Sequence, residues 1–306
     1  MRLVFCGTPE FAVPGLQALV AVGHDVTAVV TRPDRPKGRG GRLQSSPVKE
    51  AALTHALPVC QLHPKDPAFL AWLTGQQPEV LVVVAYGHIL SGPVLQAAPG
   101  GAVNVHASLL PAYRGAAPVQ RAILNGERST GVTTMYMDPG MDTGDIILQE
   151  AMPIRDEDDA GTLLGRLAES GALLLVRTLA GLGALQRLKQ DEAKVSYASP
   201  LTPADEVIHW AEAAAAVVNR VRALSPRPGA YTIWQGRRLK IWRACQGPAA
   251  EGVIPGRVVR AGAGEIVVGA GDGTVSILEL QAEGGKRLTT DAFLRGSVMG
   301  EGAHLG

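Results

Sequence analysis

The sequence predicts an α/β protein built from two parts: an open, mostly parallel β-sheet with helices on both faces, and a smaller β-barrel after it. Strand and helix patterns alternate through residues 1–188, which favours a parallel sheet. The near-continuous apolar run EVLVVVAYG, residues 79–87, is typical of a central strand that is covered on both faces. Further along, short strand-like runs separated by glycine indicate the barrel.

The elements of the first part follow in order from local signals. A short apolar strand opens the chain, and Gly23 is a stop signal for the helix after it. Pro47 stands near the start of the second helix, where its missing N–H is not needed. We expect strands at residues 2–7, 24–31, 58–62, 79–87, 101–108, 131–137 and 145–152, and helices at residues 9–23, 46–57, 66–76, 117–126 and 160–182.

A polar segment that contains Pro200 and Pro203 separates the two parts, as expected of a linker. We therefore predict a Rossmann-like domain at residues 1–188, a linker at 189–203 and a barrel domain at 204–306. In the second domain we expect one helix at residues 204–224 and strands at residues 229–236, 237–245, 256–262, 265–271 and 274–281.

The composition narrows the class of protein. Of the 306 residues, 46% are hydrophobic and 19% are charged, which is ordinary for a soluble globular protein. No apolar run approaches the roughly 20 residues that cross a bilayer, and the N-terminus reads as a strand rather than a signal peptide. We therefore expect a cytoplasmic protein with no membrane contact. A net charge of +1 gives no general attraction for a polyanion, and the cysteines lack metal-ligand spacing, so we expect no metal.

Polar side chains interrupt an apolar strand near its end. Asn104 and His106 are two residues apart and so point to one face, at the end of the strand where open α/β sheets bind ligands. The loop MDPGMDTGD, residues 137–145, follows a later strand, and its glycines permit a tight turn with unusual backbone angles. Asp142 of that loop would reach His106 if the two strands are neighbours. The ordinary alternative is a satisfied buried histidine beside a turn asparagine.

These three side chains suit the transfer of an acyl group to an amine. The Asn104 amide can donate a hydrogen bond to a developing oxyanion. His106 can give or take a proton near neutral pH, and a carboxylate from Asp142 favours its charged form. Ser108 lacks the glycine-flanked turn of a serine nucleophile, so we interpret it as a turn residue.

The segments NVHASLLPAYRGAAPVQRAILNG and GVTTMYMDPGMDTGDII resemble the folate-dependent formyltransferases, with FCGTPEFAV and VVVAYGHIL matching in order and spacing. The resemblance covers essentially the whole chain. It implies 10-formyltetrahydrofolate as formyl donor and Asn104, His106 and Asp142 as the catalytic residues. Ala107 departs from the glycine that many relatives have. The implied folate-binding residues are Tyr86, Gly87, Ile89, Ser108, Leu109, Leu110 and Pro111.

That family divides by acceptor: a glycine-derived ribonucleotide, an amino sugar nucleotide, or methionyl-tRNA. The basic segment at residues 31–49, with its PDRP-x-GRG core, is similar to the arm of the tRNA branch, and residues 204–306 resemble that branch's oligonucleotide-binding (OB-like) barrel. The resemblance thus implies formylation of initiator methionyl-tRNA for translation initiation. By charge alone, the basic residues of the segment at residues 31–49 could equally be ordinary solvated side chains, whereas the clustering of those after residue 219 favours contact with phosphates. The implied tRNA-binding residues are Arg35, Lys37, Arg39, Arg42, Arg220, Arg237 and Arg238.

Two alternatives remain open from the sequence. The first is a formyltransferase that acts on an amino sugar nucleotide, although such a relative would be expected to lack the basic arm. The second is a non-catalytic tRNA-binding factor, which would not need Asn104, His106 or Asp142. We also expect a monomer, because no heptad pattern or long apolar stripe calls for a partner.

Overall fold

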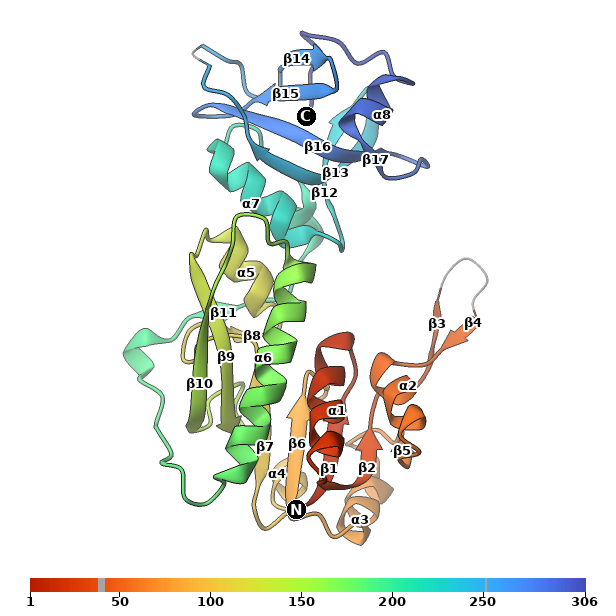
Figure 1. The fold of residues 1–306 in the computed structure, drawn as a ribbon, viewed down its shortest axis with the longest axis vertical. Helices are drawn as coiled ribbons and strands as arrows, with labels where there is room; N and C mark the ends of the chain where they lie inside the picture. Colours follow the sequence, from red (N-terminus) through yellow and green to blue (C-terminus); the bar gives the residue numbers. More distant parts are fainter. Residues whose placement is uncertain (38–41, 251) are drawn as a thin grey trace. The chain divides into compact units, whose positions relative to one another are not determined.

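The computed structural model describes residues 1–37, 42–250 and 252–306 (Figure 1). By packing, the chain divides into two compact units. The N-terminal unit comprises Met1–Pro118, Ser129–Pro153 and Leu164–Ala198. The C-terminal unit comprises Val119–Arg128, Ile154–Leu163 and Ser199–Gly306. Two short segments that precede residue 164 therefore belong to the C-terminal unit.

The N-terminal unit is built on a seven-stranded sheet with the order β10-β9-β7-β6-β1-β2-β5. Five strands run parallel, β1 (Arg2–Gly7), β2 (Asp25–Val30), β5 (Val59–Cys60), β6 (Val80–Val84) and β7 (Ala102–His106). At one edge, β9 (Ser129–Tyr136) is antiparallel to β7, and β10 (Ile146–Pro153) is antiparallel to β9. The prediction of an open, mostly parallel sheet is confirmed.

Helices cover both faces of this sheet because its strands are apolar on both sides. One face packs against α1 (Val13–Ala21), α2 (Pro47–Thr54) and α6 (Ala160–Ala180). The other face packs against α3 (Pro67–Gly75) and α4 (Gly92–Leu95). Alternate residues of one strand enter the two cores, as Val82 and Leu81 of β6 do.

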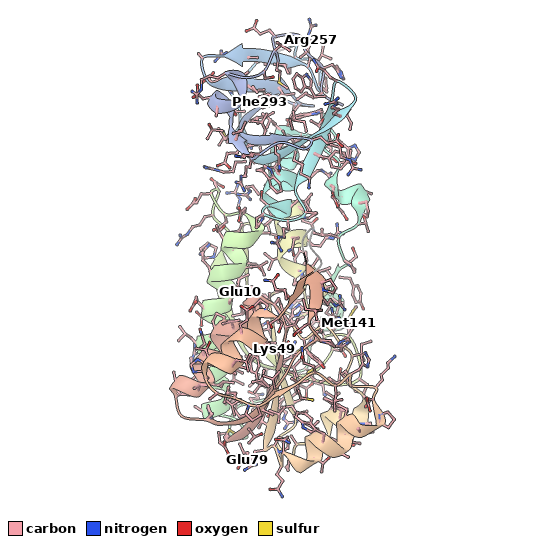
Figure 2. The ribbon with its side chains drawn as sticks, turned by 90° about the vertical axis from the view of Figure 1, so that its right-hand side faces the viewer. Glu10, Lys49, Glu79, Met141, Arg257 and Phe293 are labelled. Carbon is pink, nitrogen blue, oxygen red and sulfur yellow. The ribbon has the colours of Figure 1, made fainter. Side chains whose placement is uncertain are left out.

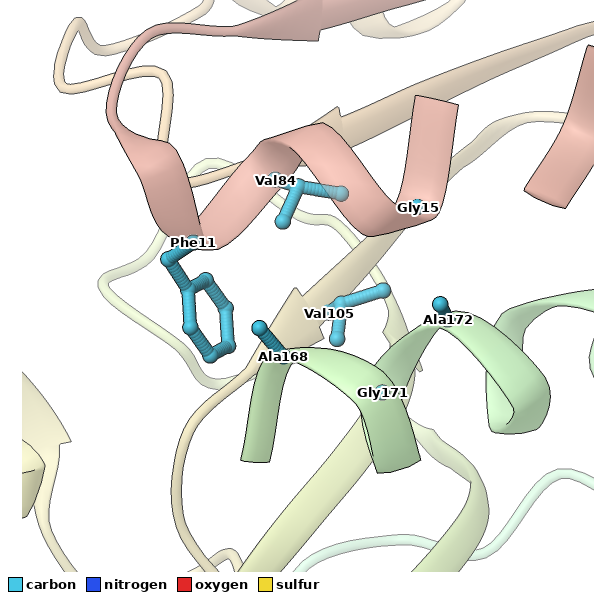
Figure 3. A pocket seen from close by; sticks show the side chains of 7 residues that line it. All are labelled: Phe11, Gly15, Val84, Val105, Ala168, Gly171 and Ala172. Carbon is cyan, nitrogen blue, oxygen red and sulfur yellow. The ribbon is translucent and has the colours of Figure 1, made fainter. Parts of the chain in front are cut away.

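Small residues let two helices lie close to the sheet. Gly15 of α1 and Gly171 of α6 face each other across Val84 and Val105, beside Phe11 (Figure 3). A Cβ added at Gly171 would lie 3.0 Å from the Val105 side chain. The apolar hollow between these residues has no room for a water molecule, so it is a packing feature and carries no ligand.

Side-chain caps mark the start of two helices of this unit. The Ser46 hydroxyl accepts a hydrogen bond from Lys49 N and caps α2, while Asp66 caps α3 by accepting from Ala68 N. The remaining short elements are η1 (Glu10–Ala12), the hairpin β3 (Arg35–Lys37) and β4 (Arg42–Gln44), β8 (Arg114–Gly115), η2 (Glu192–Lys194) and β11 (Tyr197–Ala198), which pairs with β8.

The C-terminal unit contains an antiparallel sheet with the order β12-β13-β16-β15-β14. Its strands are β12 (Ala230–Trp234), β13 (Arg237–Gln246), β14 (Val258–Gly262), β15 (Glu265–Gly269) and β16 (Thr274–Ala282), with β17 (Leu288–Thr289) paired to β16. Val217 and Val221 of α7 (Ala214–Leu224) pack against Leu239, Ile241 and Ile277 of the sheet. The unit also contains α5 (Pro118–Leu124), η3 (Pro203–Glu206) and α8 (Thr290–Leu294). The strands predicted for this part are confirmed.

The helix predicted at residues 204–224 begins ten residues late, so that part of the prediction is wrong. Instead, Ile208 N donates to Tyr231 O and the buried Trp210 donates to the Thr232 hydroxyl. These tertiary bonds hold the segment against β12 and override its helix-forming composition. The helix starts at Ala214, whose N–H donates to the Asp272 carboxylate.

Candidate functional site

The carboxyl end of β7 brings together the polar residues that stood out in the sequence. β7 and β9 are neighbours, with His106 opposite Thr133. The loop at residues 137–145 leaves β9 after Tyr136, which pairs with Val103 near the amino end of β7, and the Asp142 side chain of this loop reaches His106. The His106 Nδ1 lies 3.7 Å from the Asp142 Oδ2. Both side chains are mostly buried, at 8% and 19% exposed.

The other nitrogen of His106 faces a backbone carbonyl. Nε2 lies 3.0 Å from Tyr113 O. Because a carbonyl only accepts, this contact assigns the hydrogen of the neutral ring to Nε2. Nδ1 is then the basic nitrogen, and it faces the carboxylate of Asp142. A proton that arrives at Nδ1 would meet a negative charge.

Asp142 is held in an uncommon backbone conformation. Its φ is +55°, in the left-handed region, and its Oδ2 accepts a hydrogen bond of 2.8 Å from Gly115 N. The unusual backbone angle expected of the loop glycines therefore belongs to the aspartate itself. Gly144 serves a different purpose, because a Cβ there would lie 1.7 Å from Tyr136 O. Met141, labelled in Figure 2, is 58% exposed and precedes the aspartate.

Asn104 lies on β7 two residues before His106, and it is 8% exposed. Within the described residues, its side-chain amide makes no hydrogen bond with protein. A mostly buried amide without a protein partner retains both donors for a ligand. The site therefore places an available donor, a basic nitrogen and a carboxylate along one strand end.

The turn at residues 108–111 is tied firmly to β9 and β10. The Thr133 hydroxyl donates to Ser108 O at 2.6 Å and accepts from Leu110 N at 3.1 Å. Gln149 Nε2 donates to Leu110 O at 2.8 Å. The Ser108 hydroxyl donates to Ala112 O and is 1% exposed, in keeping with a turn residue. Leu110 is buried, whereas Leu109 and Pro111 are partly exposed.

The segment after β6 is the second expected wall of a folate pocket. Tyr86 is 2% exposed, and burial, the largest cause, raises the pKa of its hydroxyl, so the group stays protonated. The Thr8 hydroxyl donates to Tyr86 O at 3.1 Å, and the Arg32 guanidinium donates to Gly87 O. Ile89 is 83% exposed and available to cover a ligand.

His88 sits in this same segment, edge-on to two other rings. Its ring centroid lies 4.5 Å from that of His63 and 5.2 Å from that of Tyr86. Burial, followed by the charge of Arg32, lowers the pKa of His88. The ring therefore favours its neutral form.

The basic segment at residues 31–49 contains the hairpin of β3 and β4, and the acid that precedes this hairpin is paired with a lysine. β3 and β4 pair Arg35 with Gln44 and Lys37 with Arg42, while Arg39 lies outside the described residues. The segment's single acid, Asp34, accepts from Lys49 Nζ at 2.6 Å; Figure 2 labels Lys49. This hydrogen bond is the main reason that the pKa of Asp34 is lowered.

A pocket of about 290 Å³ lies between this hairpin and the start of α2. Two guanidinium-bearing residues and several hydroxyl groups line it, a set that suits a phosphate or ribose. The Nε of Arg32 is buried and lacks a partner within the described residues. The lining residues are Thr8, Pro9, Arg32, Pro33, Arg35, Pro36, Gln44, Ser45, Ser46, Pro47 and Glu50.

Basic residues of the C-terminal unit differ in availability. Arg220 is committed to its own unit, with Nη2 bonded to both oxygens of Glu212 and Nη1 to Asp205 O. In contrast, Arg237 is exposed, and the Arg238 guanidinium lies 4.6 Å from the ring centre of Tyr231. Sequence reasoning missed the aromatic partner on the same sheet: Lys240 and Arg287 lie 5.3 and 5.4 Å from the ring of Trp242.

Metal-ligand clusters and membrane-spanning helices are both absent from residues 1–37, 42–250 and 252–306. No group of three or more histidine, cysteine, aspartate or glutamate residues there could hold a metal ion. Within those same ranges, every helix is too short or too polar to cross a membrane.

The chain is similar to known formyl transferases along its length. The family model described as formyl transferase matches residues 1–179, and the model described as formyl transferase, C-terminal domain, matches residues 200–298. The methionyl-tRNA formyltransferase of Pelotomaculum thermopropionicum is 51% identical over 313 residues, which cover 100% of this chain and 99% of that protein. The protein of the same name from Moorella thermoacetica is 53% identical over 310 residues, with 100% and 99% covered.

Comparison with a solved structure supports the fold of this chain and carries no conclusion about its substrate. The N-formyltransferase from Helicobacter canadensis, in complex with folinic acid and dTDP-3-aminofucose, has a TM-score of 0.71 and 20% sequence identity. The match covers 90% of this chain and 98% of that one.

Proposed function

The chain belongs to the formyl transferase family, and we propose on that premise that it transfers the formyl group of 10-formyltetrahydrofolate to the α-amino group of methionine on initiator methionyl-tRNA. The observation that carries this proposal is the meeting of His106, Asp142 and the unpartnered Asn104 amide at the end of β7. The product serves translation initiation, which places the enzyme in the cytoplasm.

The residues of the site have distinct roles in this proposal. Bound 10-formyltetrahydrofolate supplies a formyl carbonyl. Asn104 donates a hydrogen bond to the oxygen of that carbonyl, where negative charge develops during attack by the amine. His106 takes the proton of the amine at Nδ1, because Nε2 is occupied by Tyr113 O. Asp142 stabilises the resulting imidazolium from 3.7 Å.

We assign the folate to the space between the turn at residues 108–111 and the segment after β6. The turn is held by Thr133 and Gln149, so its apolar side chains form a fixed wall. Gly87 has φ of +78°, and a Cβ there would lie 3.0 Å from the Arg32 guanidinium, so glycine keeps this wall open. The folate-binding residues are Tyr86, Gly87, Ile89, Ser108, Leu109, Leu110 and Pro111.

We assign tRNA contact to basic residues of both units. In the N-terminal unit, Arg35 lines the pocket beside the hairpin, and Lys37, Arg39 and Arg42 belong to the same basic segment. In the C-terminal unit, Arg237 is exposed, and the Arg238 guanidinium lies over the ring of Tyr231. Arginine beside aromatic rings suits both phosphates and unstacked bases. Arg220 is left out, because its guanidinium is already neutralised by Glu212.

The acceptor distinguishes this proposal from the amino sugar alternative. Relatives that bear the methionyl-tRNA name are about half identical to this chain over its whole length, whereas the structure crystallised with an amino sugar nucleotide is 20% identical. The basic hairpin also favours tRNA. We further propose that the protein works as a monomer, which sedimentation analysis tests directly.

The test measures formyl transfer to methionyl-tRNA and, separately, to a dTDP-amino sugar. Wild-type protein is expected to formylate only the tRNA. His106→Ala is expected to lower kcat by roughly 100- to 10,000-fold, the range of a lost general base, and to leave tRNA affinity nearly unchanged. His55→Ala, which alters an exposed histidine of the same unit, is the matched control. Turnover near the wild-type level in His106→Ala would remove this residue from the mechanism.

A further inference from the structure

We propose that Gln190 and Arg114 are positioning residues that hold Asp142 opposite His106. The inference rests on the proposed function and concerns a segment that sequence composition marks as a linker. Gln190 lies 48 residues from Asp142 in the chain, yet its side chain contacts the backbone of the aspartate directly.

The Gln190 amide binds two backbone carbonyls of the loop that carries Asp142. Its Nε2 donates to Asp142 O and to Gly144 O, each at 2.8 Å. An amide nitrogen has two hydrogens, so both are used on this loop. The two carbonyls flank Thr143, and holding them sets the course of the chain on both sides of that residue.

Arg114 sets the orientation of that amide. Arg114 is 1% exposed, and its Nε donates to Gln190 Oε1 at 3.0 Å. Because a guanidinium only donates, it selects the orientation in which Gln190 turns its NH₂ group to the loop. The buried charge of Arg114 is balanced by Glu192, which accepts from Nη2 at 2.9 Å and is itself 75% exposed.

The segment from Tyr113 to Gly115, which includes β8, contacts the side chains of both His106 and Asp142 through its backbone. Tyr113 O accepts from His106, and Gly115 N donates to Asp142. β8 is in turn paired with β11, through Arg114 and Tyr197. Arg114 thus links the backbone that holds the histidine to the glutamine that holds the aspartate loop.

The hydrogen bonds from Gln190 stabilise an unfavourable backbone conformation at Asp142. The φ of +55° at Asp142 is uncommon for a residue other than glycine, and such a conformation is disfavoured when nothing supports it. Such a backbone conformation is retained only where neighbouring groups hold it in place. The two hydrogen bonds from Gln190 to the carbonyls of Asp142 and Gly144 provide this support.

Two variants separate the donor role of Gln190 from its packing. Gln190→Glu keeps an acceptor for Arg114 but loses both donors and places a carboxylate against two carbonyls. Gln190→Ala loses all of these contacts. We expect each variant to lower kcat for methionyl-tRNA formylation by roughly 10- to 100-fold, the cost of a small misplacement, with KM for both substrates within about 2-fold of wild type. Gln186→Ala, which alters an exposed glutamine four residues earlier, is the matched control and should retain wild-type kinetics.

A double-mutant cycle tests whether Gln190 acts through Asp142. In an Asp142→Asn background, followed under single-turnover conditions, Gln190→Glu should cost less than about 2-fold. The NMR resonances of the His106 ring give a second reading that needs no turnover: Gln190→Glu and Asp142→Asn should shift them in the same direction.

The outcomes distinguish this inference from the proposed function. A wild-type protein that does not formylate methionyl-tRNA contradicts the proposed function. If wild type is active, the positioning role is overturned by unchanged kcat in Gln190→Glu, by an equal loss in both backgrounds, or by His106 resonances that do not move.

Discussion

Gly144 determines how closely the loop of Asp142 approaches β9. A Cβ at this position would lie 1.7 Å from Tyr136 O, far inside any real contact, so the backbone of the loop would have to move. Asp142 is two residues away and would move with it. The role of this glycine is therefore the space it leaves for a carbonyl, and any larger residue should alter the site.

Gly144→Ala is expected to lower kcat for formyl transfer by at least roughly 10-fold, since displacement of a catalytic group by about 1 Å has effects of that order. Steady-state kinetics with saturating tRNA measure it. Gly75→Ala is the control, because a Cβ there meets nothing within 4 Å. Wild-type kcat in Gly144→Ala would show that the loop can accommodate the methyl group without moving the aspartate.

Single residues were predicted well where their partners are local. The two-residue spacing of Asn104 and His106 placed both on one strand face, because side chains alternate along a strand. The position of Asp142 depended on β7 and β9 being neighbours. Gln190 carried no local signal at all, since it stands in a polar segment whose composition suits a linker equally well.

An ion pair joins two elements of the C-terminal unit. Arg121 of α5 donates to Asp205 of η3 at 2.6 Å from Nη1 and at 3.0 Å from Nη2. These hydrogen bonds are the largest cause of a pKa of about 2 for Asp205, compared with an ordinary value of 3.8. A carboxyl whose pKa is depressed by folding stabilises the folded state above its unfolded pKa, and this stabilisation is lost as pH falls toward the folded pKa.

Asp205→Asn should lower the free energy of unfolding by on the order of 1 kcal/mol at pH 7, and the difference from wild type should shrink as pH falls from about 4 toward about 2. Urea unfolding at several pH values measures it. Glu265→Gln, which removes an exposed ion pair with Arg260, should have little effect at any pH. A difference that stays constant or grows in acid would contradict the assignment.

Elements with a strong internal pattern were predicted correctly, and those defined by contacts were not. The strand β6 could be predicted from its own run of apolar residues. In contrast, residues 207–210 have a helix-forming composition but are held in place by Tyr231 and Thr232. β8 and β11 are too short to have a periodicity and exist only as partners of each other.

For the molecule as a whole, a net charge of +1 means that tRNA must be attracted by local groups of cations. Each phosphate contact releases counterions, so binding weakens as salt rises. Both units carry exposed arginine that can make such contacts, Arg35 beside the pocket and Arg238 beside Tyr231.

Arg35→Ala and Arg238→Ala are each expected to weaken binding of methionyl-tRNA at low salt and to reduce the slope of log K against log salt by about 1. Folate affinity should be unchanged. Arg177→Ala removes an exposed arginine of α6 that is paired with Glu150, and it should leave the slope as in wild type. Slopes that match wild type in Arg35→Ala and Arg238→Ala would show that these residues touch no phosphate.

The sequence by itself determined the sheet class, the order of the main strands, the strand-end pair Asn104 and His106, and the resemblance to a formyl transferase. These depend on periodicity and on motifs in which the informative residues are close together. Only the tertiary structure decided that Nδ1 of His106 faces Asp142, that the aspartate adopts a left-handed conformation, and that Gln190 and Arg114 hold it there. The physical reason is that these features are hydrogen bonds between segments far apart in the chain, and no local pattern specifies which distant donor a carbonyl will meet.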